Sequence, residues 1–311
     1  MPARDNVSSR LRTAMLTQTA AAPLAEPGIP EPLLDFKSRV LAGILLLLVF
    51  AIYAPTLIWT GRVILSSDDM AHGMCAPFIA AYVVFQKRKS VLSNLAAPNG
   101  WGLVALILAG LLATSGSLGD STTVLRFAFL ISLASCLVLT GGFQTLSQLK
   151  FPILLLLFTF PIPPTLYAQL TGPLQSVATS LSQSCLEVLG FSALREGNLL
   201  ELPHYRLSIV EACSGIRSLV TLLFFCCIYA YFMKREFWQR IALVALSIPA
   251  ALLLNVVRIT VTGIIGEWRP ELTKGIYHES LGWICLALGF GLALAFYRVL
   301  HYITRGFSFA R

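Results

Sequence analysis

Residues 211–232 read EACSGIRSLVTLLFFCCIYAYF, in which a cysteine and an arginine stand at the head of a long apolar run. The run Ser214–Phe232 has roughly the length that a helix needs to cross a bilayer. The rest of the chain has the same character, because 56% of its 311 residues are hydrophobic and only 12% are charged. Soluble domains carry roughly 25% charged residues, so this chain lacks the polar surface that such a domain requires. The sequence therefore predicts an all-α polytopic membrane protein.

About eight apolar segments are predicted to cross the membrane. Met70–Phe85 is short, but it can span where the bilayer thins or where its polar end continues the helix. Leu149–Pro161 must end or kink in the proline-rich stretch that follows Phe160, because proline removes backbone donors. The predicted spans are Val40–Trp59, Met70–Phe85, Trp101–Leu118, Val124–Leu139, Leu149–Pro161, Ser214–Phe232, Ile241–Ile265 and Leu281–Tyr302.

Basic residues set the predicted orientation. They lie in the loops and tails beside the spans, and cytoplasmic loops carry an excess of Lys and Arg. The Lys87-Arg88-Lys89 and Lys234-Arg235 loops are therefore expected in the cytoplasm, together with both termini. The net charge of +8 therefore comes from basic residues that orient the spans, and it does not indicate a nucleic-acid partner.

The predicted domain organisation has three parts, a membrane domain and a tail on each side of it. Residues 1–39 are polar and rich in Ala and Pro, as in a flexible cytoplasmic tail. Residues 40–303 form the membrane domain, and 304–311 form a basic cytoplasmic C-terminal tail.

Two extracytoplasmic elements are predicted between the fifth and sixth spans. Gln169–Gly190 is too polar to cross, but Leu170, Leu174 and Leu181 recur along one helical stripe. This pattern predicts an amphipathic helix that lies on the outer surface. In residues 197–210, two short alternating runs around Pro203 predict a small β-hairpin packed against the membrane domain.

The predicted topology brings three reactive side chains to the outer face. Cys213 precedes a span that begins outside, and His278 precedes the final span by three residues. Arg258 lies about 17 residues, or roughly 25 Å, along the span that begins inside at Ile241. All three side chains are therefore expected on one side of the membrane at similar depth.

The chemistry of these residue types suits acyl transfer through a thioester on Cys213. A helix N-terminus and nearby cations favour the thiolate. His278 could act as general acid or base, and Arg258 could stabilise an oxyanion or orient a carbonyl. Asn255 lies one turn before Arg258 and could orient it, and Arg217 supplies a second cation one turn after Cys213.

These motifs resemble the exosortase/archaeosortase family of membrane transpeptidases, over about residues 40 to 300. The resemblance rests on the segments Ala212-Cys213-Ser214-Gly215-Ile216-Arg217, Asn255-Val256-Val257-Arg258, His278 ahead of Gly282-Trp283, Ala71-His72-Gly73 and Pro161-Ile162-Pro163. It implies that Cys213, Arg258 and His278 are catalytic, with His72 among the supporting residues. Glu279 follows His278 where many members carry aspartate, and it could orient the histidine.

The resemblance also implies a substrate class. Family members process exported proteins that carry a C-terminal Pro-Glu-Pro-like motif, a membrane helix and a basic tail. The expected setting is the bacterial cytoplasmic (inner) membrane, often beside exopolysaccharide production. No cofactor is expected, and either water or an unidentified amine acceptor would resolve the thioester.

Two other functions are open. A membrane zinc protease would use His278-Glu279, but an HExxH motif needs a second histidine where this chain has Gly282. A non-enzymatic component of polysaccharide transport or assembly would explain an intramembrane arginine, since charged residues often line pathways. It would leave Cys213 without a role.

Overall fold

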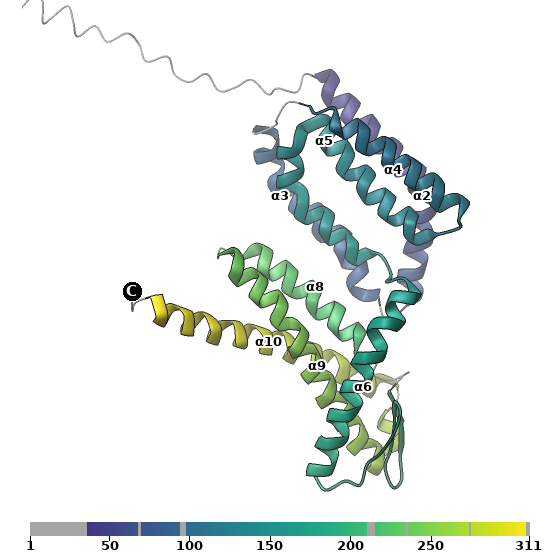
Figure 1. The fold of residues 1–311 in the computed structure, drawn as a ribbon, viewed down its shortest axis with the longest axis vertical. Coiled ribbons are helices and arrows are strands. Elements are labelled where there is room, and N and C mark those ends of the chain that lie inside the picture. The colour runs from purple at the N-terminus through teal and green to yellow at the C-terminus, as the bar shows by residue number, and fades with distance from the viewer. Residues whose placement is uncertain are drawn as a thin grey trace, which may run out of the picture.

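The computed structural model describes residues 36–67, 70–93, 98–209, 215–233, 236–273 and 275–308, without the side chains of 36–39, 90, 92–93, 278–279 and 303–308. These residues form two helical bundles, which occupy the upper and lower halves of Figure 1. The N-terminal bundle consists of α2 (Phe36–Ser66), α3 (Ala71–Ser93), α4 (Trp101–Leu118) and α5 (Thr122–Leu155). The C-terminal bundle consists of α6 (Pro164–Val188), α8 (Ile216–Phe232), α9 (Phe237–Trp268) and α10 (Gly275–Ser308), with a small sheet and the short helix η3 (Pro270–Thr273).

Helix α5 contains a sharp turn that divides it into two arms. Gly142 has φ 70° and ψ 179°, a conformation far from helical that glycine tolerates because it has no Cβ. The arms on its two sides run in different directions in Figure 1. The two spans predicted near Val124–Leu139 and Leu149–Pro161 thus lie on the two arms of α5. The chain changes direction between them at Gly142, and no loop joins them.

Prolines separate the two bundles, at the place where the sequence predicted that the span Leu149–Pro161 ends or kinks. After α5 the short 3₁₀ helix η2 (Leu156–Thr159) ends just before the proline-rich stretch. Helix α6 then begins at Pro164, where the missing N–H costs nothing because the first turn has no partner for it. Pro163 precedes it as the N-cap residue.

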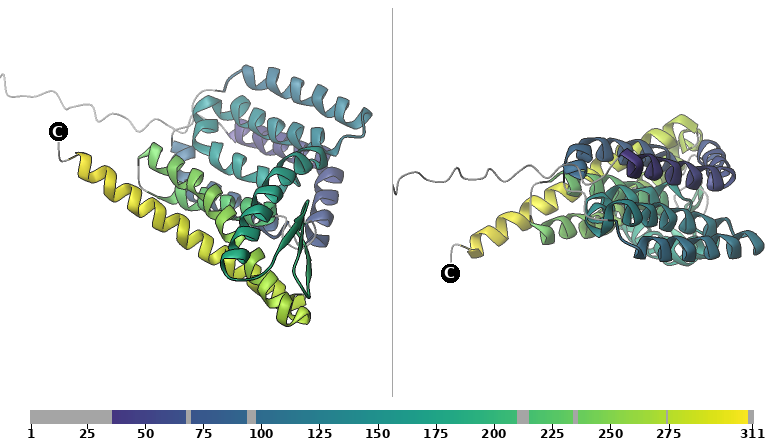
Figure 2. Two further views of the ribbon diagram at one scale, coloured as in Figure 1. Left: turned by 60° about the horizontal axis from the view of Figure 1, so that its bottom comes forward. Right: turned by 90° about the horizontal axis from the view of Figure 1, so that it is seen from above.

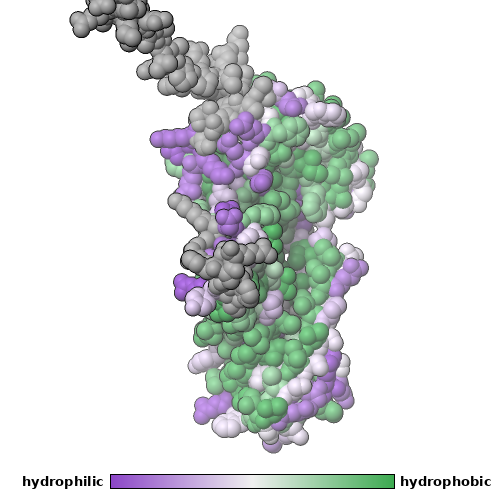
Figure 3. Space-filling view, turned by 60° about the vertical axis from the view of Figure 1, so that its left-hand side comes forward, coloured by the Kyte–Doolittle hydropathy of each residue, from purple (hydrophilic) through white to green (hydrophobic). Residues whose placement is uncertain are grey.

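Five helical segments of the described chain are long and apolar enough to cross a membrane. They are Val40–Ser66, Trp101–Leu118, Thr122–Thr159, Phe237–Trp268 and Gly275–Tyr302, and Ile216–Phe232 is a shorter apolar helix. Hydrophobic residues cover most of the face shown in Figure 3, and hydrophilic residues gather mainly toward its ends. The all-α polytopic membrane fold is therefore confirmed, while the number of eight crossings stays a prediction.

Two helix boundaries differ from the sequence-based ones. Residues 86–89, expected in a cytoplasmic loop, belong to α3, so the polar end does continue this short span. Helix α10 begins at Gly275 and continues to Ser308, so it starts before the predicted span and extends into the predicted C-terminal tail. Its far end projects beyond the bundle in both views of Figure 2.

The small sheet has three strands rather than the two of the predicted hairpin. Strands β1 (Leu194–Glu196), β2 (Leu199–Glu201) and β3 (Arg206–Ser208) pair antiparallel in that order. The predicted hairpin corresponds to β2 and β3, and β1 was not predicted. Leu207 and Ile209 alternate with exposed residues and pack into a cluster with Val256 and Ile259 of α9. The sheet is therefore fixed against the C-terminal half of α9.

Helix α6 buries its polar face and exposes its apolar stripe. Gln175 and Ser182 are buried, whereas Leu170 and Leu181 are 44% and 47% exposed. The Ser182 hydroxyl donates to the carbonyl of Val256 in α9 at 3.3 Å. The predicted amphipathic helix is thus present, but its polar side faces the protein rather than water.

The two bundles meet along α8. Phe224 of α8 packs with Ala76 and Ala80 of α3 and with Leu155 of α5. Toward the other end of α8, the rings of Tyr231 and Phe151 stack at 3.8 Å between centroids. Helix α8 is thus the part of the C-terminal bundle that contacts α3 and α5 of the N-terminal bundle.

Candidate active site

The candidate site starts at the N-terminus of α8. Gly215 is the N-cap residue of this helix, with φ +70°, a left-handed conformation that favours glycine. Cys213, the predicted nucleophile, lies in the stretch 210–214, outside the described residues. Gly215 follows Cys213 by two positions, and its neighbours define this part of the site.

Asn255 of α9 lies against Gly215. A Cβ atom at position 215 would lie 2.8 Å from the Nδ2 atom of Asn255, which is closer than real contacts of this kind. The Asn255 side chain is 5% exposed. Only a glycine lets the start of α8 approach this buried amide so closely.

Arg258 lies one turn further along α9 and reaches α10. Its side chain is 7% exposed. A Cβ at Gly282 of α10 would lie 3.5 Å from the guanidinium Cζ atom, an ordinary van der Waals contact. The guanidinium group therefore packs against the backbone of α10 at Gly282.

A crevice of about 10 Å³ joins these three helices. Its lining includes Ser218 of α8, Asn255 and Arg258 of α9, and Cys285 of α10. Since a water molecule needs about this much space, the crevice can take one oxygen-sized group but not a substrate side chain. This side of α8 is closely packed.

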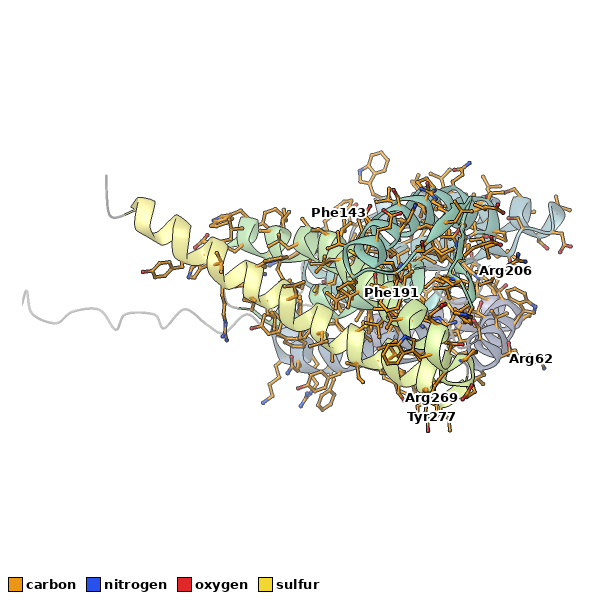
Figure 4. All side chains as sticks on the ribbon, turned by 90° about the horizontal axis from the view of Figure 1, so that it is seen from below. Arg62, Phe143, Phe191, Arg206, Arg269 and Tyr277 are labelled. Carbon is orange, nitrogen blue, oxygen red and sulfur yellow. The ribbon has the colours of Figure 1, made fainter. Side chains whose placement is uncertain are left out.

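His278 and Glu279 lie in the first turn and a half of α10. The sequence placed them in a loop before the helix, and that expectation was wrong, because α10 already begins at Gly275. Gly275 has φ +62°, so the chain turns there into the helix. Position 278 is one turn before Gly282 on the same helix face, although the side chains at 278 and 279 are not described. Figure 4 shows Arg269 and Tyr277 projecting outward around this turn between α9 and α10.

His72 and Arg217 border a different space, on the side of α8 that faces the N-terminal bundle. Both line a pocket of about 510 Å³. His72 of α3 is 6% exposed, and its Nδ1 atom lies 3.3 Å from the hydroxyl of Thr221. Thr221 is one turn after Arg217 on α8. His72 therefore contacts the same face of α8 that carries Arg217.

The predicted residues thus form two groups that meet at the start of α8. Asn255 and Arg258 lie with Gly215 and Gly282 on one side, and His72 and Arg217 lie at the pocket on the other. His204, a further histidine of the described chain, lies away from both groups, because its Nδ1 atom is 2.6 Å from Glu267 at the far end of α9. Within the described part of the chain, no three His, Cys, Asp or Glu residues form a group that could hold a metal ion.

Sequence reasoning missed Cys285 and the pocket. Cys285 lies inside the predicted span Leu281–Tyr302 and lines the same crevice as Arg258. Its spacing from Gly282 on α10 could have indicated this, because residues three apart share a helix face. The pocket draws its walls from both bundles, and no local pattern predicts such a space.

Fold and site together define a multi-pass helical membrane protein whose buried polar residues gather where α8, α9 and α10 meet. The chain belongs to the transmembrane exosortase family, since the family model described as Transmembrane exosortase (Exosortase_EpsH) matches residues 59–296. This confirms the resemblance and gives the protein a general role in membrane transpeptidation and sorting, with exported proteins as substrates. No curated protein and no solved structure matches the chain.

Proposed function

We propose that this protein cleaves the C-terminal sorting signal of exported proteins through a thioester on Cys213. The observation that carries the proposal is the meeting of α8, α9 and α10, through Gly215, Asn255, Arg258 and Gly282. Consecutive Cα atoms are about 3.8 Å apart, so the Cα of Cys213 lies within about 7.6 Å of that of Gly215. The thiol and the buried arginine are therefore expected in one site.

In the proposed reaction, the Cys213 thiolate attacks the carbonyl carbon of the scissile peptide bond. The carbonyl electrons move to oxygen, and Arg258 donates hydrogen bonds to the resulting oxyanion. When the tetrahedral intermediate collapses, the C–N bond breaks and His278 protonates the departing amine. A thioester then joins the substrate to Cys213.

A second nucleophile resolves the thioester. Water or an amine attacks the thioester carbonyl, and His278, now neutral, takes the proton that this nucleophile loses. The thiolate of Cys213 departs and is ready for another substrate. Water gives a shortened protein, whereas an amine gives a protein joined to its acceptor.

Arg258 suits this role because of where it is buried. An arginine inside an apolar span is costly, so such residues usually face the interior and mark functional sites. The guanidinium group is always charged and presents donors in a fixed plane. Its packing on Gly282 restricts its position before the substrate arrives.

The test is an immunoblot of a tagged exported protein with a Pro-Glu-Pro-type tail, co-expressed with the wild-type enzyme or with one cysteine variant. Cys213→Ala should abolish processing at equal enzyme level. Cys185→Ala, on the exposed side of α6, and Cys285→Ala, beside Arg258, should both process the tail. Processing that survives Cys213→Ala but fails in Cys285→Ala would assign the nucleophile to Cys285.

If all three variants process the tail as well as the wild type does, thioester chemistry at these positions is wrong. The protein would then fit better as a non-enzymatic component of polysaccharide transport or assembly. That function uses an intramembrane arginine but requires no thiol.

The proposed location is the bacterial inner membrane, with the site on the extracytoplasmic face, both termini in the cytoplasm and a link to exopolysaccharide-associated sorting. Orientation can be tested by replacing the seven native cysteines and introducing Ser117→Cys or Arg88→Cys. A membrane-impermeant maleimide should label position 117 in intact spheroplasts and position 88 only after lysis. The reverse pattern would put the site in the cytoplasm.

A further inference from the structure

A second buried arginine lies in the N-terminal bundle, and the proposed reaction does not use it. Arg126 stands one turn after the start of α5 and is 4% exposed. Its Nε atom donates to the hydroxyl of Thr60 in α2 at 3.2 Å. Its Cζ atom lies 5.0 Å from the centroid of the Trp59 ring. Because an arginine inside an apolar span is costly, such a residue usually marks a functional site.

The hydrogen bonds of this guanidinium group are incomplete. Its Nη2 atom is enclosed and has no hydrogen-bond partner. The Thr60 hydroxyl that accepts from Nε is a neutral group, and it donates its own proton to the carbonyl of Thr56 at 2.8 Å. In the described part of the chain, no acidic side chain forms an ion pair with Arg126. An anionic oxygen would therefore meet both the charge of Arg126 and its free donor.

The surface next to this guanidinium group faces lipid. Ile58 and Trp59 of α2 and Phe127 of α5 are exposed apolar side chains. They belong to helical segments that are long and apolar enough to cross a membrane, so they face the acyl chains around the protein. The Trp59 ring lies beside the guanidinium group, and exposed side chains change rotamer within nanoseconds. Movement of this one ring is expected to open the Nη2 atom to the lipid.

Arg126 lies near one end of its span. It follows Thr122, the first residue of α5, by four residues, which is about 6 Å along the helix axis. Arg62, near the end of α2, is exposed and lies at the edge of the molecule in Figure 4. It follows Trp59 by three residues, so the two side chains share a face of α2. Arginine and tryptophan near the ends of spans are typical of the membrane interface, so both arginines are expected at the depth of the lipid headgroups.

We propose that Arg126 binds the phosphate of an anionic membrane lipid, which approaches between α2 and α5. The Nη2 atom donates to a phosphate oxygen, and the exposed Arg62 adds positive charge. The planar guanidinium group matches a phosphate in geometry as well as in charge. A lipid is favoured over a free anion because Ile58 and Phe127, exposed beside the site, offer contacts to acyl chains. The bound lipid would hold α2 and α5 together at this end of the N-terminal bundle.

Native mass spectrometry of the full-length protein in a neutral detergent tests the ligand. The three probes are phosphatidylglycerol, diacylglycerol with the same acyl chains, and glycerol phosphate, which has no chains. The wild-type protein should retain phosphatidylglycerol at a concentration at least about 10-fold below that needed for either other probe, because only phosphatidylglycerol offers both charge and chains. Equal binding of diacylglycerol would show a site for acyl chains alone, and equal binding of glycerol phosphate would show a site for free anions. Either result would overturn the proposal.

The variant Arg126→Met tests the residue, because it removes the charge and keeps a side chain of similar reach. It should raise the apparent dissociation constant of phosphatidylglycerol about 10-fold, which corresponds to about 1.4 kcal/mol, and leave that of diacylglycerol unchanged. Arg88→Met is the matched control, since Arg88 is an exposed arginine on α3, and it should leave both constants unchanged. Unchanged phosphatidylglycerol binding by Arg126→Met, or an equal loss in Arg88→Met, contradicts the proposal.

Photocrosslinking locates the lipid on the wild-type protein, so it does not depend on the folding of a variant. Phosphatidylglycerol with a photoreactive group next to its phosphate should label the segments 56–62 and 123–127, as mapped by peptide mass spectrometry. Excess unlabelled phosphatidylglycerol should remove this label, and diacylglycerol should not. Labelling only outside these segments, or labelling that excess lipid does not remove, would refute the site. Neither measurement requires Cys213, so both results are independent of the proposed thioester.

Discussion

The two sides of the first turns of α8 differ in the space they leave. On the side of the N-terminal bundle they border a pocket of about 510 Å³ with mostly apolar walls. On the side of α9 and α10 they border a crevice of about 10 Å³ around Asn255 and Arg258. A substrate segment fits on the first side alone, while the second side holds polar groups at fixed positions.

This difference separates the demands of binding from those of chemistry. Selective binding needs a cavity, whereas stabilising a transition state needs donors that do not move when charge develops. The start of α8 touches both sides, so Cys213 is expected at their boundary. We call the side with the crevice the closed side and the side with the pocket the open side. Substitutions on the closed side should therefore reduce the processing of all substrates alike. The effect of substitutions on the open side should differ from one substrate to another.

The largest effect is expected from Arg258→Lys. Lysine keeps the charge but lacks the planar set of donors, so processing should fall about 100-fold or more, as for a lost oxyanion donor. The measurement is the initial rate of tail processing in membranes with equal enzyme content. Arg298→Lys, at an exposed position on α10, is the matched control and should keep the wild-type rate. Near-normal processing by Arg258→Lys would make Arg258 a structural residue.

The next effect is expected from Gly215→Ala, at the junction of the two sides. The added Cβ would meet Asn255 at 2.8 Å, and φ +70° is unfavourable for alanine. Displacing the start of α8 by about 1 Å should reduce processing about 10- to 100-fold for every substrate.

Gly110→Ala on α4 provides the control for Gly215→Ala, because a Cβ there meets nothing within 4 Å. It should process the tail at the wild-type rate. If Gly215→Ala does so as well, the contact with Asn255 does not position the site.

The sequence predicts the closed side better than the open one. Arg258 and Asn255 stand out because polar residues inside an apolar run are costly. Asn255 and Arg258 are one helical turn apart in the same span. The alternation of the spans places that part of the span on the same side of the membrane as the start of α8. The pocket has no such signature, since its walls combine ordinary apolar residues from distant segments such as Val63 and Leu170.

Helix α6 shows a second limit of sequence-based prediction. Its stripe of Leu and Val residues correctly predicts an amphipathic helix, but not which face meets the protein. In water the apolar face would be buried, whereas beside lipid the polar face can be buried through hydrogen bonds such as that of Ser182. Gly142 and β1 were missed because a single-residue turn and a three-residue strand leave too little pattern to read.

A smaller effect is expected on the open side from His72→Phe. Phenylalanine keeps a ring between Phe158 and Phe224 but removes the nitrogen that lies 3.3 Å from Thr221. Loss of one hydrogen bond should reduce processing about 5-fold, which corresponds to about 1 kcal/mol.

Thr221→Val removes the other partner of this hydrogen bond, together with the bond that the hydroxyl donates to the carbonyl of Arg217, so it should lose at least as much processing as His72→Phe. The double variant should then be no worse than Thr221→Val alone, because partners in one bond are not additive. An additive double variant would show that His72 acts through something other than Thr221.

The smallest effect is expected far from both sides, at the contact between the sheet and the end of α9. Glu267 accepts from the backbone N–H of His204, and the His204 Nδ1 atom lies 2.6 Å from its carboxylate. Because the His204 side chain is 79% exposed, Glu267→Gln should cost at most about 1 kcal/mol. It should lower the thermal midpoint in detergent by a few degrees and leave processing within about 2-fold of wild type. Glu196→Gln, on exposed β1, should change neither quantity; a Glu267→Gln enzyme that loses activity would extend the functional region to the sheet, beyond the two sides of α8.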